Sequence, residues 1–255
     1  MNYKNCNAII TGGASGLGGA TADNIIKNGG KTTIIDIQNK LGKKKTNELG
    51  NNCNFINIDI TDEEVVQNKF KEIVNKSGPI NLIVNCAGIG SPSKILSKKG
   101  VCPLSLFSKI ININLIGTFN TLKAAANLMQ NNTLEEDSSR GVIVNTASIA
   151  AYDGQIGQAA YSASKGGIVG MTLPIARELA KQNIRVNTIA PGLFETPLLA
   201  ELPEEAKNSL IDSTLHPHRL GRPSEFADLV KHIFENEMIN GETIRLDGSL
   251  RMAPR

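Results

Sequence analysis

The chain has 255 residues, 40% hydrophobic and 20% charged, which suits a single α/β domain. Its formal net charge of +3 is too small to indicate nucleic acid or a membrane surface as a partner. The four cysteines contain no CxxC pair and favour a reducing compartment over a disulfide framework. No apolar run reaches the roughly 18–20 residues that span a bilayer, and the segment before the first strand is too short for an ordinary signal peptide.

Short β-branched runs alternate with helical patterns along the chain. Strands are predicted at Ala8–Thr11, Thr32–Ile37, Asn54–Ile58, Leu82–Cys86, Val142–Thr146, Arg185–Ile189 and Thr243–Leu246. Helices are predicted at Gly18–Lys27, Asp62–Asn75, Leu104–Gln130, Tyr161–Lys181 and Ser224–Glu235. Apolar strands joined by helical crossovers predict an α/β fold of the Rossmann type: a doubly wound, parallel, seven-stranded sheet with helices on both faces. Residues 1–255 are expected to form one dinucleotide-binding catalytic domain.

Other stretches carry local signals. Thr61–Glu64 supplies an N-cap and early acidic residues for its helix, and Pro174 predicts a kink within its helix. Gly90–Pro103 and Asn131–Arg140 are interpreted as surface loops. Residues Leu193–Arg222 form a longer segment after a strand, which is typical of a substrate lid.

The first strand runs directly into a glycine-rich turn, Thr11–Gly18, and then into a helix. Such a turn lets backbone N–H groups approach a pyrophosphate at a helix N-terminus. The turn alone would be weak evidence, but Asp36 follows at the end of the second strand. A carboxylate there binds the adenosine ribose hydroxyls and repels a 2′-phosphate, so NAD is favoured over NADP. A solvated strand-end Asp36, with Lys40 and Lys43–Lys45 nearby, is the alternative.

Tyr161 and Lys165 are four residues apart on a predicted helix and therefore project from one face. A free tyrosine has a pKa of about 10, and an adjacent ammonium favours its phenolate. Ser148 ends the preceding strand and could hydrogen-bond a substrate oxygen. A Tyr-x-x-x-Lys pair alone often occurs by chance. Together with Ser148 and the dinucleotide turn, it predicts an acid–base site.

These features resemble the motifs of the short-chain dehydrogenase/reductase family, in their usual order and over essentially the whole chain. The segments that carry the resemblance are Thr11–Gly18, Asn85–Gly88, Asn114, Ser148, Tyr161–Lys165 and Pro191–Gly192. The family resemblance implies hydride transfer between a secondary alcohol and nicotinamide. It implies Tyr161 as general acid/base, with Lys165 lowering its pKa and holding the nicotinamide ribose. Ser148 would orient the substrate oxygen, and Asn114 would anchor a water of the proton relay.

The same resemblance implies which residues hold the cofactor. Asp59 would contact adenine and Thr196 the nicotinamide carboxamide, while the single asparagine in Asn85–Gly88 departs from the commoner form with two. The implied cofactor-binding residues are Gly12, Ser15, Gly16, Leu17, Gly18, Asp36, Asp59, Ile60, Cys86, Ala87, Gly88, Tyr161, Lys165, Pro191, Phe194 and Thr196.

Longer segments are similar to one branch of the family, the 17β-hydroxysteroid and 3-hydroxyacyl-CoA dehydrogenases. They are residues 141–148, 154–161, 166–177, 190–194 and 240–248. This similarity implies a homotetrameric mitochondrial enzyme that oxidises short-chain 3-hydroxyacyl-CoA and hydroxysteroids. It implies Phe194 near the cofactor and substrate contacts from Ser148, Gln155 and Tyr161.

Alternatives to this function remain. One is a 3-oxoacyl-carrier-protein reductase, which usually requires NADP, so Asp36 argues against it. Another is a scaffold subunit in mitochondrial tRNA processing, with a tRNA methyltransferase as partner; the intact Ser148, Tyr161 and Lys165 argue that catalysis is retained beside any such role. A cytoplasmic location is the alternative to the mitochondrion.

Several weaker sequence patterns are interpreted as having no separate function. The spacing of His216, His218 and His232 does not resemble a metal site, so no metal is expected. Residues 13–17 fail the serine-hydrolase pattern at the last position. Lys94, Lys98 and Lys99 could meet the phosphates of a CoA thioester, although a solvated loop is favoured. Lys43–Lys45 is interpreted as a helix face rather than an RNA-binding patch.

Overall fold

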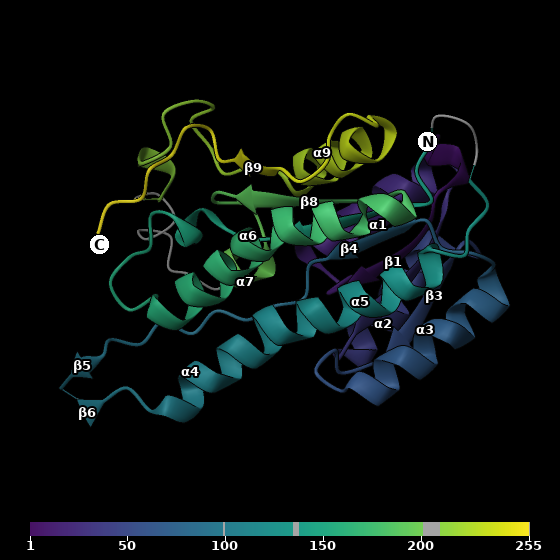
Figure 1. Ribbon diagram of the computed structural model, residues 1–255. Helices are drawn as coiled ribbons and strands as arrows, with labels where there is room; N and C mark the ends of the chain where they lie inside the picture. The colour runs from purple at the N-terminus through teal and green to yellow at the C-terminus, as the bar shows by residue number, and fades with distance from the viewer. Residues whose placement is uncertain (99, 135–137, 201–209, 255) are drawn as a thin grey trace.

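The computed structural model describes residues 1–98, 100–134, 138–200 and 210–254 (Figure 1). In this part of the chain, seven parallel strands form one sheet in the order β3-β2-β1-β4-β7-β8-β9. These strands are β1 (Asn7–Thr11), β2 (Lys31–Asp36), β3 (Cys53–Asn57), β4 (Leu82–Asn85), β7 (Gly141–Thr146), β8 (Ile184–Pro191) and β9 (Thr243–Leu246). The predicted doubly wound sheet is therefore confirmed.

Helices cover both faces of the sheet. The α-helices are α1 (Gly16–Lys27), α2 (Asn39–Leu49), α3 (Glu63–Ser77), α4 (Leu104–Ile111), α5 (Gly117–Met129), α6 (Ala159–Leu179), α7 (Pro197–Ala200) and α9 (Pro223–Glu235). A π-helix, η2 (Asn112–Ile116), joins α4 to α5. Short 3-10 helices are η1 (Tyr3–Asn5), η3 (Ile149–Ala151) and η4 (Ala180–Gln182).

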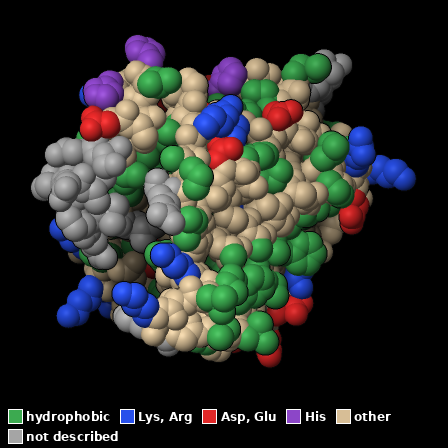
Figure 2. All heavy atoms as spheres, turned by 90° about the vertical axis from the view of Figure 1, so that its left-hand side faces the viewer, with side chains coloured by type: hydrophobic (Ala, Val, Ile, Leu, Met, Phe, Trp, Pro, Cys, Tyr) green, Lys and Arg blue, Asp and Glu red, His purple; other side chains and the backbone are tan. Residues whose placement is uncertain are grey.

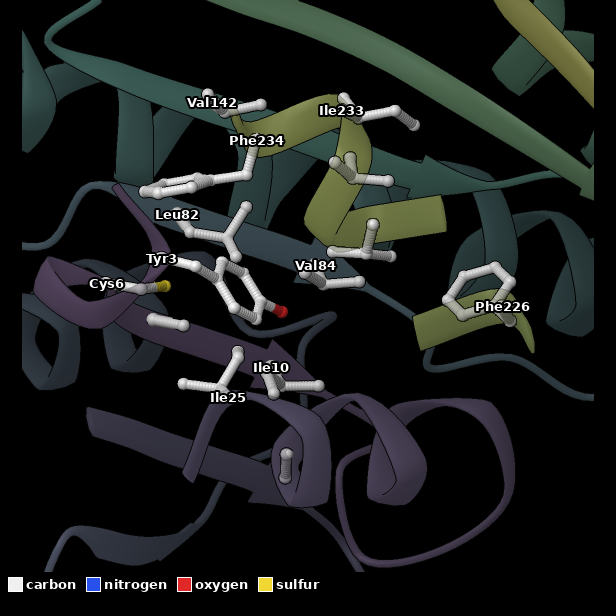
Figure 3. Close-up of a cluster of buried hydrophobic side chains, with 14 of the residues drawn as sticks. Tyr3, Cys6, Ile10, Ile25, Leu82, Val84, Val142, Phe226, Ile233 and Phe234 are labelled. Carbon is white, nitrogen blue, oxygen red and sulfur yellow. The ribbon is translucent and has the colours of Figure 1, made fainter. Parts of the chain in front are cut away.

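The core has two layers because successive residues of a strand point to opposite faces. Ile10 and Val84 pack with α1 and α9, whereas their neighbours Ile9 and Ile83 pack with α3 and α5. Figure 3 shows the first layer, in which Tyr3 from η1 meets Phe234 from α9. Burial on both faces explains why the strands read as continuous apolar runs.

Two local predictions concern the N-cap of α3 and a kink at Pro174 in α6. Asp62 caps α3, and its carboxylate accepts a hydrogen bond from Val65 N at 3.0 Å, as Thr61–Glu64 predicted. α6 continues as one helix through Pro174.

Two predicted elements need correction, and one helix was not predicted. The loop at Gly90–Pro103 contains a small hairpin, β5 (Leu96–Ser97) with β6 (Gly100–Val101), whose turn has Gly100 at φ +106°. The helix predicted at Leu104–Gln130 is interrupted by η2. α2 was missing from the predicted helices because its lysine- and asparagine-rich sequence gives only a thin apolar stripe.

Candidate active site

The predicted site residues follow the carboxyl ends of the parallel strands, where ligands bind in doubly wound folds. In Figure 1 this is the end of the molecule that also carries the hairpin β5–β6 and the last residues of the chain. Figure 2 views that end face-on, and hydrophobic side chains gather in its lower half. The turns after β1, β4, β7 and β8 all open there.

The glycine-rich turn between β1 and α1 has the conformation that its glycines permit. Gly16 has φ +54°, and a Cβ atom at Gly18 would lie 2.5 Å from the carbonyl oxygen of Gly12. Ser15 occupies the N-cap of α1 without a side-chain capping bond, which leaves first-turn N–H groups for a ligand. A cavity of about 690 Å³ adjoins the turn, and Ser15, Gly16 and Thr196 contribute to its lining. This backbone fits a dinucleotide pyrophosphate.

Asp36 lies at the carboxyl end of β2 and is 9% exposed. Its carboxylate accepts hydrogen bonds from Ala14 N at 3.3 Å and Gln38 N at 3.0 Å, which fix it beside the glycine-rich turn. The nearby Lys45 pairs with Asp23 on α1 at 2.6 Å. This lysine is therefore occupied and does not offer a free cation to a 2′-phosphate.

Two further residues predicted to bind the cofactor, Asp59 and Ile60, lie just beyond β3. The Asp59 carboxylate accepts hydrogen bonds from Thr61 N at 2.9 Å and Thr61 Oγ1 at 2.8 Å. Ile60 is buried, and its carbonyl accepts a hydrogen bond from Asn120 Nδ2 at 2.9 Å. The end of β3 is thus tied to the N-terminal part of α5.

The segment after β4 is hydrogen-bonded to Thr11 at the end of β1 and lies close to Asn114. Cys86 N donates to the carbonyl of Thr11 at 3.1 Å, and Ala87 N donates to Thr11 Oγ1 at 3.2 Å. A Cβ atom at Gly88 would lie 3.2 Å from Asn114 Oδ1 and 3.7 Å from Lys165 Nζ. A side chain at position 88 would therefore crowd Asn114, and glycine avoids this contact.

Asn114 is fully buried within the π-helix η2. Its amide exchanges two hydrogen bonds with the backbone of Ile89: Ile89 N donates to Oδ1 at 2.8 Å, and Nδ2 donates to the Ile89 carbonyl at 2.9 Å. Nδ2 also donates to Ser164 Oγ at 3.1 Å. Single π-turns within α-helices often occur at functional sites, and here the π-helix carries Asn114 against the segment after β4 and against α6.

Lys165 is almost fully buried on α6, one helical turn after Tyr161. Its ammonium donates to the carbonyl oxygen of Thr146 at 2.7 Å and lies 5.8 Å from the centroid of the Tyr161 ring. Burial lowers the pKa of Lys165 to about 8, and the charge of Cys86 opposes that shift. Burial also raises the pKa of Cys86 to about 11, although a hydrogen bond from Thr146 and the charge of Lys165 oppose it.

Ser148 and Tyr161 meet across the start of α6. Burial raises the pKa of Tyr161, and a side-chain hydrogen bond with Ser148 opposes that rise. Ser148 Oγ also accepts a hydrogen bond from Ala150 N at 3.1 Å, as the N-cap of η3. The Lys165 ammonium donates to Thr146 and lies 5.8 Å from the centroid of the Tyr161 ring, and its lowering of the Tyr161 pKa stays a prediction.

The remaining predicted residues lie around this centre. Pro191 ends β8, and Phe194 is buried against Gly221, with which it forms an isolated β-bridge. Thr196 lies beside Gly16, since its Cγ2 would be 3.7 Å from a Cβ atom at that glycine. Gln155 donates through Nε2 to the carbonyl of Ala253 at 3.0 Å. The predicted lid at 193–222 includes α7, whereas its residues 201–209 lie outside the described part of the chain.

Sequence reasoning missed the residues that hold the predicted ones in place. Thr146 anchors Lys165, and Ile89 anchors Asn114, in both cases through backbone atoms. Backbone contacts carry no residue-type signal, so no motif could have revealed them. Within residues 1–98, 100–134, 138–200 and 210–254, no group of three or more His, Cys, Asp or Glu side chains could hold a metal ion. No helix in these ranges is long and apolar enough to cross a membrane.

Comparisons with known proteins agree with this geometry. Residues 6–207 match the protein family described as short chain dehydrogenase. The chain is 51% identical over 255 residues to the 3-hydroxyacyl-CoA dehydrogenase type-2 of Homo sapiens, covering 99% of this chain and 98% of that protein. The protein of the same name from Drosophila melanogaster is 50% identical over 253 residues, with 98% and 99% covered.

A solved structure is similar over nearly the full length. The crystal structure of 3-hydroxyacyl-CoA dehydrogenase type-2 from Mycobacterium avium matches with a TM-score of 0.94 at 38% identity, covering 99% of this chain and 98% of that one. The sheet order, the glycine-rich turn and the family match together imply an oxidoreductase with a nicotinamide cofactor. On this evidence, the chain belongs to the short-chain dehydrogenase family.

Proposed function

We propose that the chain is an NAD-dependent dehydrogenase of short-chain 3-hydroxyacyl-CoA, with 17β-hydroxysteroids as a second substrate class. The convergence of Ser148, Tyr161 and Lys165 beside the glycine-rich turn carries this proposal. The names of the relatives that are 50–51% identical support the acyl-CoA substrate over the alternative of a carrier-protein reductase.

NAD is proposed over NADP on the basis of Asp36. A 2′-phosphate would meet its carboxylate, and Lys45 is already paired with Asp23. The proposed cofactor set is the one that the family resemblance implies, from Gly12 to Thr196. Asp36→Ala removes the charge that repels a 2′-phosphate. We expect the ratio of kcat/KM for NADH to kcat/KM for NADPH to fall about tenfold in this variant.

The proposed chemistry divides between the cofactor and the protein. Nicotinamide, when bound, accepts a hydride from the hydroxyl-bearing carbon of the substrate or returns it in the reverse direction. Tyr161 Oη takes the hydroxyl proton during oxidation and donates a proton to the carbonyl oxygen during reduction. Ser148 Oγ donates a hydrogen bond to the same oxygen, where negative charge develops.

Lys165 and Asn114 are proposed to complete the proton relay. An ammonium on Lys165 favours the phenolate of Tyr161 once both face a bound ligand, and it holds the nicotinamide ribose. The amide of Asn114 is committed to Ile89 and Ser164, so we propose that Asn114 anchors the relay water through its main chain.

The substrate is proposed to lie between the loop that carries Gln155 and the segment 193–222 as a lid. Lys94 and Lys98 lie on the loop after β4 and are proposed to remain solvated, whereas Lys99 falls outside the described residues. A homotetramer and a mitochondrial location are proposed from the resemblance to this branch of the family, with the cytoplasm as alternative. Co-purification of a tRNA methyltransferase with the protein would support the scaffold role beside catalysis.

The first test offers acetoacetyl-CoA with either NADH or NADPH. Consumption of each cofactor is measured by the absorbance of the reduced nicotinamide. We expect rapid oxidation of NADH and little of NADPH. If NADH binds without being consumed, the acyl-CoA substrate is wrong and hydroxysteroids become the substrates to test.

The second test is Tyr161→Phe, which removes only the phenol oxygen. We expect NADH binding to persist while kcat falls by about 10²–10⁴-fold, the usual contribution of a positioned acid–base group. Isothermal titration measures the binding and stopped-flow absorbance the turnover. Full turnover in this variant would contradict the role of Tyr161.

A further inference from the structure

Residues 247–254, which we call the strap, follow β9 and lie against the loop 153–158 that separates η3 from α6. We propose that the strap positions this loop for substrate binding and that Arg245 is the positioning residue that joins the two. The inference rests on the proposed function in one respect: it takes the loop with Gln155 as a wall of the substrate site.

Two hydrogen bonds connect the strap to the loop directly. Ile156 N donates to the carbonyl of Pro254 at 3.0 Å, and Gln155 Nε2 donates to the carbonyl of Ala253 at 3.0 Å. The first fixes the loop backbone, and the second fixes the orientation of the Gln155 amide. The side chain predicted to face the substrate is therefore held by residues almost a hundred positions later in the chain.

Arg245 on β9 binds the loop and the strap with one guanidinium group. Its Nη2 donates to Asp153 Oδ2 at 2.6 Å and to the Leu250 carbonyl at 3.0 Å, while Nε donates to Asp247 Oδ2 at 2.6 Å. The same group lies 5.1 Å from the centroid of the Tyr152 ring. The side chains of Arg245 and Asp153 are each only 21% exposed, so these charge-assisted bonds are partly shielded from solvent.

The strap itself is anchored to the rest of the site. Leu250 is buried, and the Asp247 backbone lies so close to Gly192 that a Cβ atom there would be 2.8 Å from Asp247 Cα. A Cβ atom at Gly248 would lie 2.9 Å from the carbonyl oxygen of His216. The strap thus connects the end of β8, the described end of the 193–222 segment and the loop 153–158.

The far side of the loop is also held. Ser93 N, in the segment after β4, donates to the carbonyl of Gly157 at 2.8 Å. The loop is therefore hydrogen-bonded to the strap and to the segment after β4. In the chain it lies between Ser148 and Tyr161, immediately before α6 begins. Because small displacements of positioning groups reduce the productive binding of a substrate, release of the strap should affect substrate binding before it affects the cofactor.

The test compares Arg245→Met with Arg251→Met. Arg251 is on the strap itself, is 61% exposed, and contacts Asp247 and the Leu250 carbonyl but not the loop. Both changes remove one positive charge and contacts to Asp247 and the Leu250 carbonyl, whereas only Arg245→Met also removes the contacts to Asp153 and the Tyr152 ring. We expect Arg245→Met to raise KM for acetoacetyl-CoA about tenfold while kcat and KM for NADH stay within about twofold. Arg251→Met should change none of the three.

Two further variants separate positioning from general stability. Arg245→Lys keeps a cation opposite Asp153 and should recover part of the lost substrate affinity. A chain ended at Met252 lacks both acceptor carbonyls and should show the same rise in KM. An unchanged KM in Arg245→Met, or a parallel loss of NADH affinity and thermal stability, would overturn the proposal.

Hydrogen–deuterium exchange provides a readout that does not depend on the substrate. Peptides that contain residues 153–158 should exchange faster in Arg245→Met than in Arg251→Met, because Arg245 no longer holds the loop to the strap that carries Pro254, the acceptor of Ile156 N–H. Faster exchange without turnover of acetoacetyl-CoA in the wild-type protein would leave the strap in place and contradict only the proposed substrate. Equal exchange in the two variants would contradict the strap.

Discussion

At the scale of one residue, the buried ammonium of Lys165 lowers the stability of the fold. Its ammonium is buried, and in the described part of the chain its hydrogen bond goes to a neutral carbonyl, that of Thr146, rather than to a carboxylate. Nearby Cys86 has a pKa of about 11 and is a neutral thiol at pH 7. The folded protein therefore holds a cation that it would be more stable without, a pattern typical of functional sites.

Lys165→Met is expected to stabilise the fold while it removes activity. Burial lowers the pKa of Lys165 from 10.5 to about 8, so the folded state releases this proton more readily than the unfolded chain. Below pH 8 the folded state carries the full penalty, about 3 kcal/mol. Between pH 8 and 10.5 the wild type regains this stability as the pH rises.

Urea unfolding of the two proteins at pH 7 and pH 10 measures this effect. The advantage of Lys165→Met in free energy of unfolding should be largest at pH 7 and shrink toward pH 10. The pKa shift already contains the bond of the ammonium to Thr146, so the difference between the two pH values is the diagnostic quantity. An advantage independent of pH would contradict the buried charge as its cause.

At the scale of elements, the sequence predicted what periodicity and caps encode. The central strands of the sheet were found because both of their faces are buried, and Tyr161 and Lys165 were placed together because helical spacing puts them on one face. The helix α2, the hairpin β5–β6 and the π-helix η2 were missed. The sequences of α2 and η2 have weak or ordinary patterns, and the two strands of the hairpin have only two residues each, too few to show an alternating pattern.

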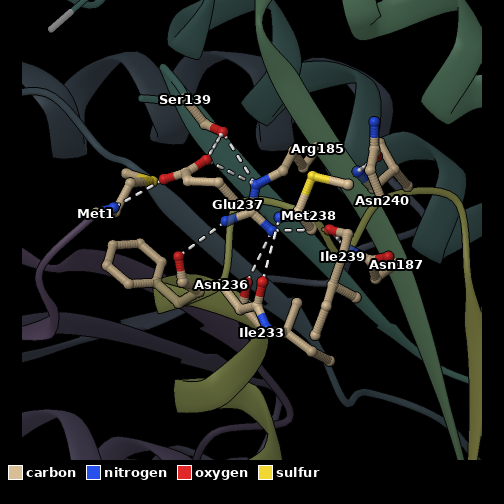
Figure 4. Close-up of polar contacts among 12 residues, drawn as sticks. Met1, Ser139, Arg185, Asn187, Ile233, Asn236, Glu237, Met238, Ile239 and Asn240 are labelled. Atoms are coloured by element: carbon tan, nitrogen blue, oxygen red, sulfur yellow. Dashed lines mark hydrogen bonds and ion pairs between the residues drawn. The ribbon is translucent and has the colours of Figure 1, made fainter. Parts of the chain in front are cut away.

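The same limit applies to contacts between distant residues. Arg185, buried on β8, donates to the carbonyls of Ile233 at 2.7 Å, Phe234 at 2.8 Å and Ile239 at 2.9 Å (Figure 4). It also pairs with Glu237 at 3.1 Å. One side chain therefore satisfies carbonyls at the C-terminus of α9 that the helix itself leaves free. Nothing in the sequence around Arg185 indicates this role.

Arg185→Met is expected to lower the free energy of unfolding by about 3–5 kcal/mol, since it leaves three buried carbonyls without their donor, while Glu237 keeps its bonds to Met1 and Ser139. The control is Lys69→Met, which breaks an exposed pair with Glu72 on α3 and should change stability by less than about 1 kcal/mol. Urea unfolding monitored by circular dichroism measures both. Equal effects of the two changes would contradict the role of Arg185.

At the scale of the whole molecule, apolar side chains remain exposed on one side of the helical layer. α4, η2, α5 and α6 lie together there (Figure 1), and their large exposed side chains are Leu104, Phe107, Ile116, Phe119 and Leu173. Ile116 is 51% exposed and Phe119 is 46% exposed, three residues apart on one face. Exposed apolar patches of this kind mark interaction surfaces. A second copy of the chain is the occupant that the proposed homotetramer supplies.

Phe119→Glu tests this surface because it places a charge within the exposed patch and leaves the core unchanged. Light scattering with size-exclusion chromatography should give the wild type a mass near four chains of 27.3 kDa and the variant a mass of one or two chains. Met238→Glu is the matched control: Met238 is 92% exposed beyond the end of α9, and its replacement should leave the mass unchanged. A Phe119→Glu tetramer would show that other surfaces hold the subunits together, and a monomeric wild type would exclude the homotetramer.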